Sequence, residues 1–280
     1  MHGVILIHKP LGLTSHDVVY RLRKLLNTKK IGHAGTLDPE AEGLLICAVN
    51  QATRCLKYFE SMSKHYRFKV QFGVLTDTLD HTGSVVINKP FELPAYLDLD
   101  HFKGQYLQTP PAYSAVKVQG KKLYEYAREG RSIPAVPPRT LTIHTLHQLT
   151  PLDALGEASF EVISSKGLYV RQLAFDIAKH YATVAHTTRI ERLGIGPFKL
   201  SNAHALDTVT EQSVLSIDDA LSFIEPYEMS DEEAQKVTNG QSLTLALNQP
   251  QLRMRHQQNL YAIYKQTAPG QYQADIVFPR

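Results

Sequence analysis

A short polar loop that carries one carboxylate, Asp38, has the clearest chemical potential in this chain. Three glycines surround it, Gly32, Gly35 and Gly43. Glycine adopts backbone conformations that other residues avoid, so a ligand could approach the loop closely. An apolar run, residues 44–49, follows directly and must be buried. An aspartate presented at the end of a core strand is a candidate nucleophile or general base.

The same loop also suits a purely structural role. Asp38 could cap a helix that begins at Pro39, with Glu40 and Glu42 in its first turn. These residues taken alone favour the capping interpretation. The surrounding sequence pattern reverses that preference.

Residues 32–45 resemble the signature G-H-x-G-x-L-D-P-x-A-x-G-x-L of the TruB-type tRNA pseudouridine synthases. Every defined position of the signature is filled, which makes the match far more specific than a pair of glycines. In that family the aspartate of the motif is the catalytic nucleophile. The resemblance therefore implies this role for Asp38.

Four further segments resemble the same family, and the likeness extends from residue 4 to about residue 200. They are Lys9-Pro10 with Gly12 and Thr14-Ser15, Lys64–Arg67 with the loop 76–80, residues 111–124, and residues 166–171. The resemblance implies that Tyr66 stacks on the target base and that Tyr169 lines the pocket. It also implies that Arg171 pairs with Asp38, because a guanidinium can hold a carboxylate ionised and in one orientation.

Lys9 and His33 match positions near the substrate in that family, so the resemblance predicts that both bind it. Structural alternatives exist for each of these side chains. Tyr66 could be a core aromatic residue, Arg171 an exposed arginine and Lys9 a surface lysine. His33 could make only local hydrogen bonds within its loop.

A basic, tyrosine-bearing stretch within residues 110–138 matches the RNA-gripping insertion of the family. The predicted RNA-binding residues are Lys117, Lys121, Lys122 and Arg128. Cations interleaved with tyrosines suit contact with a phosphate backbone. A second basic group, within residues 21–30, precedes the Asp38 loop. By composition alone, each group would be a solvated face.

The reaction implied by the resemblance converts a uridine in the TΨC loop of tRNA, at position 55, to pseudouridine. The N1–C1′ bond breaks, the uracil turns, and C5 joins C1′. No redox change occurs and no group is transferred from outside, so we predict neither a cofactor nor a metal. The implied partner is the TΨC stem-loop, whose uridine must be turned out of its stack.

Two rival functions are a catalytically inactive RNA-binding protein on the same scaffold and a phosphatase that uses an aspartate nucleophile. The joint presence of Asp38, Tyr66 and Arg171 argues against the first. The second needs further carboxylates to hold Mg²⁺, and no such companion stands beside Asp38. Departures from the family pattern occur at His8, where Asp or Asn is more common, and at Glu191, where an arginine is usual. An acidic side chain at Glu191 does not suit the phosphate contact that the family's arginine would make.

The overall composition is that of a globular protein. Of the 280 residues, 43% are hydrophobic and 20% charged, and the formal net charge is +3. No apolar run approaches the roughly 20 residues that a membrane span needs, and the N-terminus lacks the features of a secretory signal. We predict a cytoplasmic monomer without a membrane association or an obligate protein partner.

The expected fold class is α+β, by resemblance the pseudouridine-synthase fold, with a mixed, mostly antiparallel sheet flanked by helices. Residues 66–72 alternate strictly between apolar and polar, as in a half-buried strand. The predicted domains are a catalytic domain over 1–225 and a small, β-rich PUA-like domain over 226–280. Expected strands are 4–8, 44–49, 66–72, 139–148, 157–162, 242–247, 259–265 and 271–278. Three expected helices begin at Thr14, at Ser164–Gly167 and at Asp231. A further short helix is expected near 98–104, and another ends at Gly194–Phe198.

Overall fold

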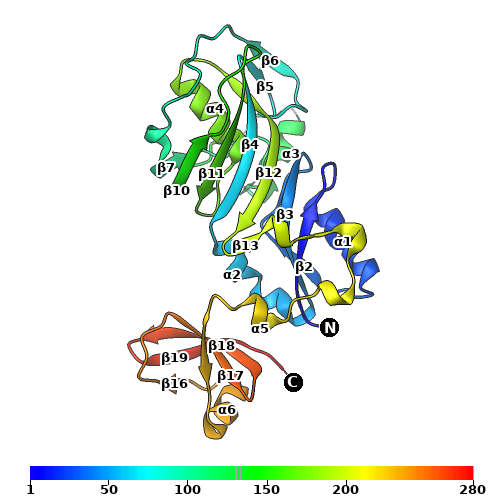
Figure 1. The fold of residues 1–280 in the computed structure, drawn as a ribbon, viewed down its shortest axis with the longest axis vertical. Helices are drawn as coiled ribbons and strands as arrows, with labels where there is room; N and C mark the ends of the chain where they lie inside the picture. The colour runs from blue at the N-terminus through cyan, green and yellow to red at the C-terminus, as the bar shows by residue number, and fades with distance from the viewer. Residues whose placement is uncertain (130, 133, 280) are drawn as a thin grey trace.

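The structure is a computed structural model that describes residues 1–129, 131–132 and 134–279; the side chain of Arg128 also lies outside the described part. It contains a ten-stranded and a five-stranded sheet (Figure 1). No helix in the described residues is long and apolar enough to cross a membrane.

The large sheet follows the order β14-β1-β3-β12-β4-β11-β10-β7, with β2 paired to β3 and β13 paired to β12. Its strands are β1 (Gly3–Lys9), β2 (Ile31–Ala34), β3 (Ala41–Val49), β4 (Lys64–Phe72), β7 (Gly104–Gln108), β10 (Arg139–Gln148), β11 (Glu157–Ser164), β12 (Ala185–Ile195), β13 (Phe198–Lys199) and β14 (His204–Ala205). Most pairs are antiparallel, whereas β1–β14 and β3–β12 are parallel. The predicted α+β class with a mixed, mostly antiparallel sheet is confirmed.

The helices beside this sheet are α1 (Ser15–Leu25), α2 (Leu56–Ser61), α3 (Leu123–Arg128), α4 (Val170–His180) and α5 (Ile217–Ala220). Two small hairpins accompany them, β5 (Val74–Thr76) with β6 (Val85–Asn88), and β8 (Lys117–Val118) with β9 (Lys121–Lys122). α1 begins after Thr14, whose side chain and that of Asp17 form the predicted capping box. This cap satisfies amide groups that the first turn leaves unpaired.

Helices α1 and α4 pack on the same face of the large sheet. Along β3, side chains two apart share a face. Ala41 packs in one core cluster with Leu173 of α4, and Cys47 packs in another with Leu22 of α1. The intervening Leu44 faces the opposite side, where it packs with Phe59 of α2. Helices α1 and α4 therefore cover different parts of one face of the sheet.

Residues 185–195 form a long strand, β12, where the sequence pattern predicted a short helix ending at Gly194–Phe198; that prediction was wrong. β12 lies between β3 and β4 in the middle of the sheet. Thr187, Thr188 and Ile190 are β-branched, which favours an extended backbone. Tertiary pairing on both edges then outweighs the short apolar pattern that suggested a helix.

The C-terminal sheet has the order β15-β17-β18-β19-β16. Its elements are β15 (Glu225–Glu228), α6 (Asp231–Thr238), β16 (Leu243–Thr244), β17 (Gln251–His256), β18 (Asn259–Ala268) and β19 (Gln271–Val277). This confirms a β-rich, PUA-like region, although β15 and β17 were not predicted. Ile263 of β18 packs in one cluster with Leu44 and Phe59 of the first part. The division of the chain at residue 225 stays a prediction.

Candidate active site

A cavity of about 440 Å³ lies between the Asp38 loop, the start of α4 and the start of the insertion. Four of the predicted catalytic and substrate-binding residues line it, together with Lys117 of the insertion: Asp38, Tyr66, Tyr169 and Arg171. These side chains come from segments far apart in the chain, and the fold brings them together on the sheet face that α4 covers. The cavity is the candidate active site.

The backbone around Asp38 excludes the capping interpretation. Residues 36–38 are irregular, Pro39 and Glu40 form a turn, and strand β3 begins at Ala41. The α1 residue Ser15 fixes the loop: the Leu37 amide donates to Ser15 Oγ at 2.9 Å, and Oγ donates to the Leu37 carbonyl at 3.2 Å. The loop is therefore held by tertiary contacts, and Asp38 is left to face the cavity.

Arg171 holds Asp38 from the buried side. Its Nη2 and Nε lie 2.8 Å and 3.0 Å from the same oxygen, Asp38 Oδ2. The Arg171 side chain is only 6% exposed, whereas that of Asp38 is 48% exposed. The contact fixes one carboxylate oxygen, and half of the carboxylate remains open to a ligand.

The same guanidinium also joins two other loops to the site. Arg171 Nη1 donates to the Thr78 carbonyl at 2.6 Å, and Nη2 donates to the Tyr113 carbonyl at 2.9 Å. Asp80 Oδ2 lies 3.6 Å from Nη1. Because Arg171 stands at the start of α4, where the helix dipole disfavours a cation, these acceptors offset an unfavourable position.

Two tyrosines form walls of the cavity. Tyr66 lies on β4 and is 8% exposed, which puts its ring in the core cluster as well as at the cavity. Tyr169 directly precedes α4, and burial raises the pKa of its hydroxyl. The side-chain amide of Gln108 binds the Tyr169 backbone twice: Oε1 accepts from the amide at 2.8 Å and Nε2 donates to the carbonyl at 3.0 Å.

Two buried cations at the cavity were missed by the sequence analysis. Arg192 is 1% exposed and donates to the carbonyls of Leu44 at 2.7 Å and Gly35 at 2.8 Å. Lys64 donates from Nζ to the carbonyls of Glu60 and Met62, and burial lowers its pKa to about 8. Alternation along a correctly predicted β12 would have placed Arg192 on the inner face.

Lys9 holds the Asp38 loop through hydrogen bonds to backbone carbonyls. Its side chain is fully buried, and Nζ donates to the carbonyls of Leu13 at 2.6 Å, Pro10 at 3.0 Å and Pro39 at 3.3 Å. Burial lowers its pKa to about 8. The surface-lysine alternative is therefore wrong. Lys9 is not among the residues that line the cavity, so its contact with a substrate stays a prediction.

His33 lies on β2, half-buried, with its Nδ1 atom buried and without a hydrogen-bond partner in the described part of the chain. Burial lowers its pKa, and the charges of Arg192 and His16 lower it further. His33 pairs with Cys47 across β2 and β3, so it lies on the sheet face that α1 covers. Its role toward a substrate stays a prediction.

The basic insertion contributes to the mouth of the cavity. Lys117 is exposed and lines the cavity. Lys121 forms an ion pair with Glu129, and Lys122 Nζ lies 5.4 Å from the centre of the Tyr124 ring. The side chain of Arg128 falls outside the described residues. The RNA contacts of all four cations stay predictions.

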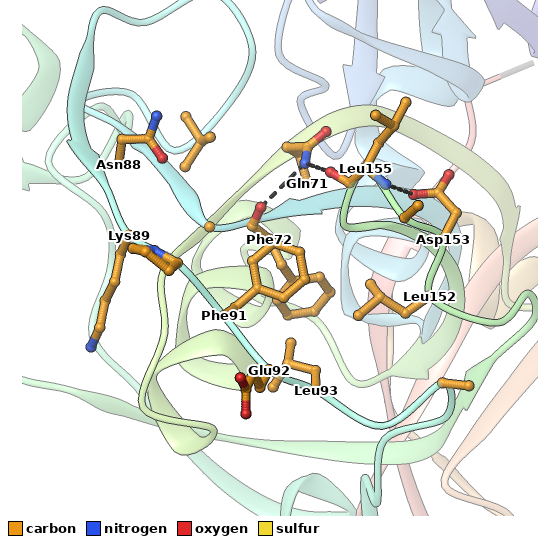
Figure 2. A pocket seen from close by; sticks show the side chains of 15 residues that line it. Gln71, Phe72, Asn88, Lys89, Phe91, Glu92, Leu93, Leu152, Asp153 and Leu155 are labelled. Carbon is orange, nitrogen blue, oxygen red and sulfur yellow. Dashed lines mark hydrogen bonds between the residues drawn. The ribbon is translucent and has the colours of Figure 1, made fainter.

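A second cavity, about 950 Å³ in volume, lies at the ends of β4 and β5 away from Asp38 (Figure 2). Phe72, Phe91 and Leu152 give it an apolar floor, and none of the predicted site residues lines it. Its lysine, Lys89, donates to the Ala182 carbonyl, and Asp153 accepts backbone amides. Lys89 and Asp153 are thus already bonded, in contrast to the open carboxylate of Asp38. Among the described residues, no group of three or more His, Cys, Asp or Glu side chains is placed to hold a metal ion.

Comparison with solved structures defines the class of protein. The fold matches a box H/ACA ribonucleoprotein bound to a substrate RNA containing 2′-deoxyuridine, with a TM-score of 0.71, 20% identity, and coverage of 99% of this chain and 85% of that chain. It also matches a Cbf5-Nop10-Gar1 complex, with a TM-score of 0.70, 22% identity, and coverage of 99% and 84%. The fold is that of the pseudouridine synthases.

Sequence comparison narrows this class to one family. A family model described as TruB family pseudouridylate synthase (N terminal domain) matches residues 23–170. A tRNA pseudouridine synthase B of Bacillus pumilus is 41% identical over 261 residues, covering 88% of this chain and 84% of the relative. Another, of Streptococcus sanguinis, is 37% identical over 281 residues, covering 94% and 95%. The chain belongs to the TruB family of pseudouridine synthases.

Proposed function

We propose that this protein isomerises the uridine at position 55, in the TΨC loop of tRNA, to pseudouridine. The single observation that carries the proposal is the half-open carboxylate of Asp38, which Arg171 holds at 2.8 Å inside a cavity that Tyr66 lines. The relatives of similar length are named tRNA pseudouridine synthase B, which supports tRNA as the substrate. A uridine in a hairpin loop suits the cavity, because duplex RNA hides its base edges.

The target nucleotide enters the cavity by base flipping. Taking the base out of its stack costs a few kcal/mol, and stacking on Tyr66 offsets part of that cost. Tyr169 also lines the cavity, and its backbone is fixed by Gln108. Cations at the cavity, among them Lys117 and Arg139, hold the phosphates on either side of the flipped nucleotide.

Asp38 then assists cleavage of the N1–C1′ bond. The electron pair of that bond leaves with the uracil, and the open oxygen of Asp38 stabilises the electron-poor fragment through a covalent bond. The uracil turns within the cavity, C5 bonds to C1′, and Asp38 is released. The proton on C5 moves to the medium through Tyr66, whose hydroxyl acts as the base, and N1 takes up a proton from the medium in exchange. Atoms and electrons then balance without any added group.

Because the reaction balances internally, we expect it to need no metal ion and no organic cofactor. Activity on RNA that has been folded beforehand should persist in excess EDTA. Loss of activity that one particular divalent ion restores would contradict this expectation.

The direct test is release of tritium from C5-tritiated uridine in an unmodified tRNA transcript. We expect release from the full transcript and from its isolated TΨC stem-loop, and loss of release when the uridine at position 55 is replaced by cytidine. Mapping pseudouridine in RNA from a strain that lacks the protein checks the position in cells. If position 55 stays modified there while another uridine loses its mark, the proposed target is wrong.

A further inference from the structure

Helix α1 covers the same face of the large sheet as α4 and the cavity. Its buried residues pack on that face, as Leu22 and Cys47 show. Arg23 Nη2 donates to the Ile31 carbonyl at 3.1 Å, so this side of the helix faces β2. His33 of β2 pairs with Cys47 of β3, so the face that carries the cavity continues beneath α1.

Exposed side chains also follow the outer face of α1, away from the sheet. His16, Tyr20 and Lys24 come at steps of four residues, and all three are exposed. Lys24 lies two residues, or about 200°, around the helix from the buried Leu22. Lys24 Nζ lies 4.5 Å from the centre of the Tyr20 ring, which is 54% exposed.

Two more exposed lysines, Lys29 and Lys30, extend the charge into the turn before β2. We call Tyr20, Lys24, Lys29 and Lys30 the α1 stripe. Between residues 11 and 37 the sequence has a single acidic residue, Asp17. Its carboxylate accepts hydrogen bonds from the Thr14 backbone and hydroxyl within the helix cap.

The positive charge of the α1 stripe is not neutralised within the described part of the chain. No ion pair is found there for Lys24, Lys29 or Lys30. The insertion differs, because its Lys121 and Arg131 both pair with Glu129. A polyanion that binds the α1 stripe therefore displaces no ion pair described there. A polyanion that binds Lys121 or Arg131 must compete with Glu129.

We propose that the α1 stripe is a second binding surface for the sugar–phosphate backbone of the substrate tRNA, on the same side of the large sheet as the cavity. This proposal rests on the proposed function. An RNA whose loop enters the cavity lies over the sheet face that α4 and α1 both cover, so its backbone can reach α1. Flexible lysines around an exposed ring suit phosphate contact, which positions an RNA without reading its bases.

The test compares two double variants that remove the same charge. The stripe variant is Lys24→Gln with Lys30→Gln. The control variant is Lys179→Gln with Lys199→Gln, both exposed. Lys199 of β13 lines a different cavity, together with His65 and Gly196. Lys179 lies in the last turn of α4, at the opposite end of that helix from Arg171.

The measurement is the dissociation constant for an unmodified tRNA transcript across a series of KCl concentrations, with the rate of pseudouridine formation at saturating enzyme. We expect the stripe variant to bind about tenfold more weakly at low salt, with a salt slope reduced by about 1 to 2. The control variant should keep a slope close to that of the wild type. The saturating rate should be unchanged in both, because neither pair belongs to the catalytic machinery.

Equal slopes for the two double variants would overturn the proposal, because general loss of charge would then explain any weakening. A stripe variant with the wild-type slope would overturn it as well. The proposed function fails separately, namely if the wild-type protein binds the transcript but forms no pseudouridine at position 55. Thermal unfolding of each variant verifies that these exposed substitutions leave the fold intact.

Discussion

Asp38 and Arg171 differ in exposure, and that difference separates their roles. The Arg171 guanidinium donates hydrogen bonds to Asp38 and to two backbone carbonyls. It can therefore fix the orientation of Asp38, but it has few N–H groups left to bind a substrate. Asp38 is bonded on one oxygen only and faces the cavity. We therefore expect the open group to be the reactive one and the buried group to support it.

Replacing Asp38 by Asn should abolish turnover while RNA binding stays nearly intact. The amide keeps the size of the side chain but removes the nucleophilic charge, so kcat should fall by more than about 10³-fold. Stability should fall by only about 1 kcal/mol, because Asp38 is half exposed and Arg171 keeps its other acceptors. Single-turnover assays and urea unfolding measure both effects.

The matched control is Glu40→Gln, which removes a carboxylate from the same loop. It should retain turnover, because Glu40 faces His81 at 3.6 Å and does not line the main cavity. Multiple turnover by Asp38→Asn would disprove the nucleophile role.

Lys9 gives the protein a predictable pH dependence of stability. Its pKa in the folded state is about 8, below the 10.5 of an ordinary lysine, and burial is the main cause. Between these values the unfolded chain binds more protons than the folded one, so this residue makes the free energy of unfolding rise with pH. The favourable contribution is complete above pH 10.5 and is lost as the pH falls through 8.

The expected measurement is a urea titration at pH 7 and pH 9.5 on wild type and Lys9→Met. From the lower to the higher pH, the wild type should gain about 1–2 kcal/mol relative to the variant. Lys179→Met, which removes an exposed lysine, should follow the wild type. Parallel curves for wild type and Lys9→Met would contradict the assigned shift.

At the scale of elements, the start of α4 carries both Tyr169 and Arg171, and strand β7 anchors it. Gln108 of β7 is 2% exposed and binds both backbone groups of Tyr169. Further along the helix, Tyr106 of β7 donates to Asp176. The strand thus positions the helix start, and through it the partner of the nucleophile.

Replacing Gln108 by Ala should therefore lower kcat more than it raises KM. Its loss leaves the Tyr169 amide unpaired, while the Tyr169 carbonyl keeps its bond from the Leu173 amide. An unpaired amide costs about 1–3 kcal/mol in stability, and the shifted helix start displaces Arg171. We expect a fall in kcat of about 10²-fold, as for misplacement of catalytic groups by about 1 Å. Steady-state kinetics on the tRNA transcript measure this effect.

Gln148→Ala is the matched control for this change. Gln148 also binds backbone on both sides of its amide, to the Leu97 amide and to the carbonyls of Ala95 and Thr150, but does so away from the cavity. It should lose comparable stability and keep its kcat. Equal kcat values for the two variants would show that Gln108 has only a structural role.

Sequence patterns predicted some elements well because those elements follow local rules. The strand at Tyr66 alternates, and the helix after Thr14 has its capping box, so both were found. β12 was missed because its pairing with two neighbours, and not its local composition, makes it a strand. Arg192 was missed for the same reason, since its inward position follows from β12.

At the site, short motifs identified Asp38 and Arg171, and the structure brings these two side chains together as expected. Gln108 and Lys64 could not be identified in this way. Their roles depend on which backbone groups stand opposite them in the fold, and such long-range contacts leave no periodic signal in the sequence.

At the scale of the whole molecule, the C-terminal sheet lies below α2 and α5 (Figure 1) and packs against the part of the core that contains Phe59 of α2. Residues 226–280 carry as many acidic as basic residues. Lys57 and Tyr58 of the first part both bind Asp275 of β19, and Arg54 donates to the Val277 carbonyl. These contacts tie the C-terminal sheet to the face of the large sheet opposite the candidate site.

Strand β18 belongs to two apolar clusters at once. Ile263 packs with residues of the large sheet, such as Leu44, whereas the neighbouring Tyr264 packs with Met254 inside the C-terminal sheet. Because one strand serves both clusters, loosening the second should loosen the first. We therefore expect the two sheets to unfold as one cooperative unit.

Met254→Ala tests this coupling, because Met254 is fully buried and contacts only the C-terminal cluster. The cavity should cost about 2–5 kcal/mol. Hydrogen exchange read by mass spectrometry should then show faster exchange in peptides of β3 as well as of β18, by a similar factor. The exposed Val86→Ala should change neither. Unchanged protection in β3 would mean that the C-terminal sheet unfolds alone, and that its apolar contact with Leu44 transmits no stability to the strand that follows the catalytic loop.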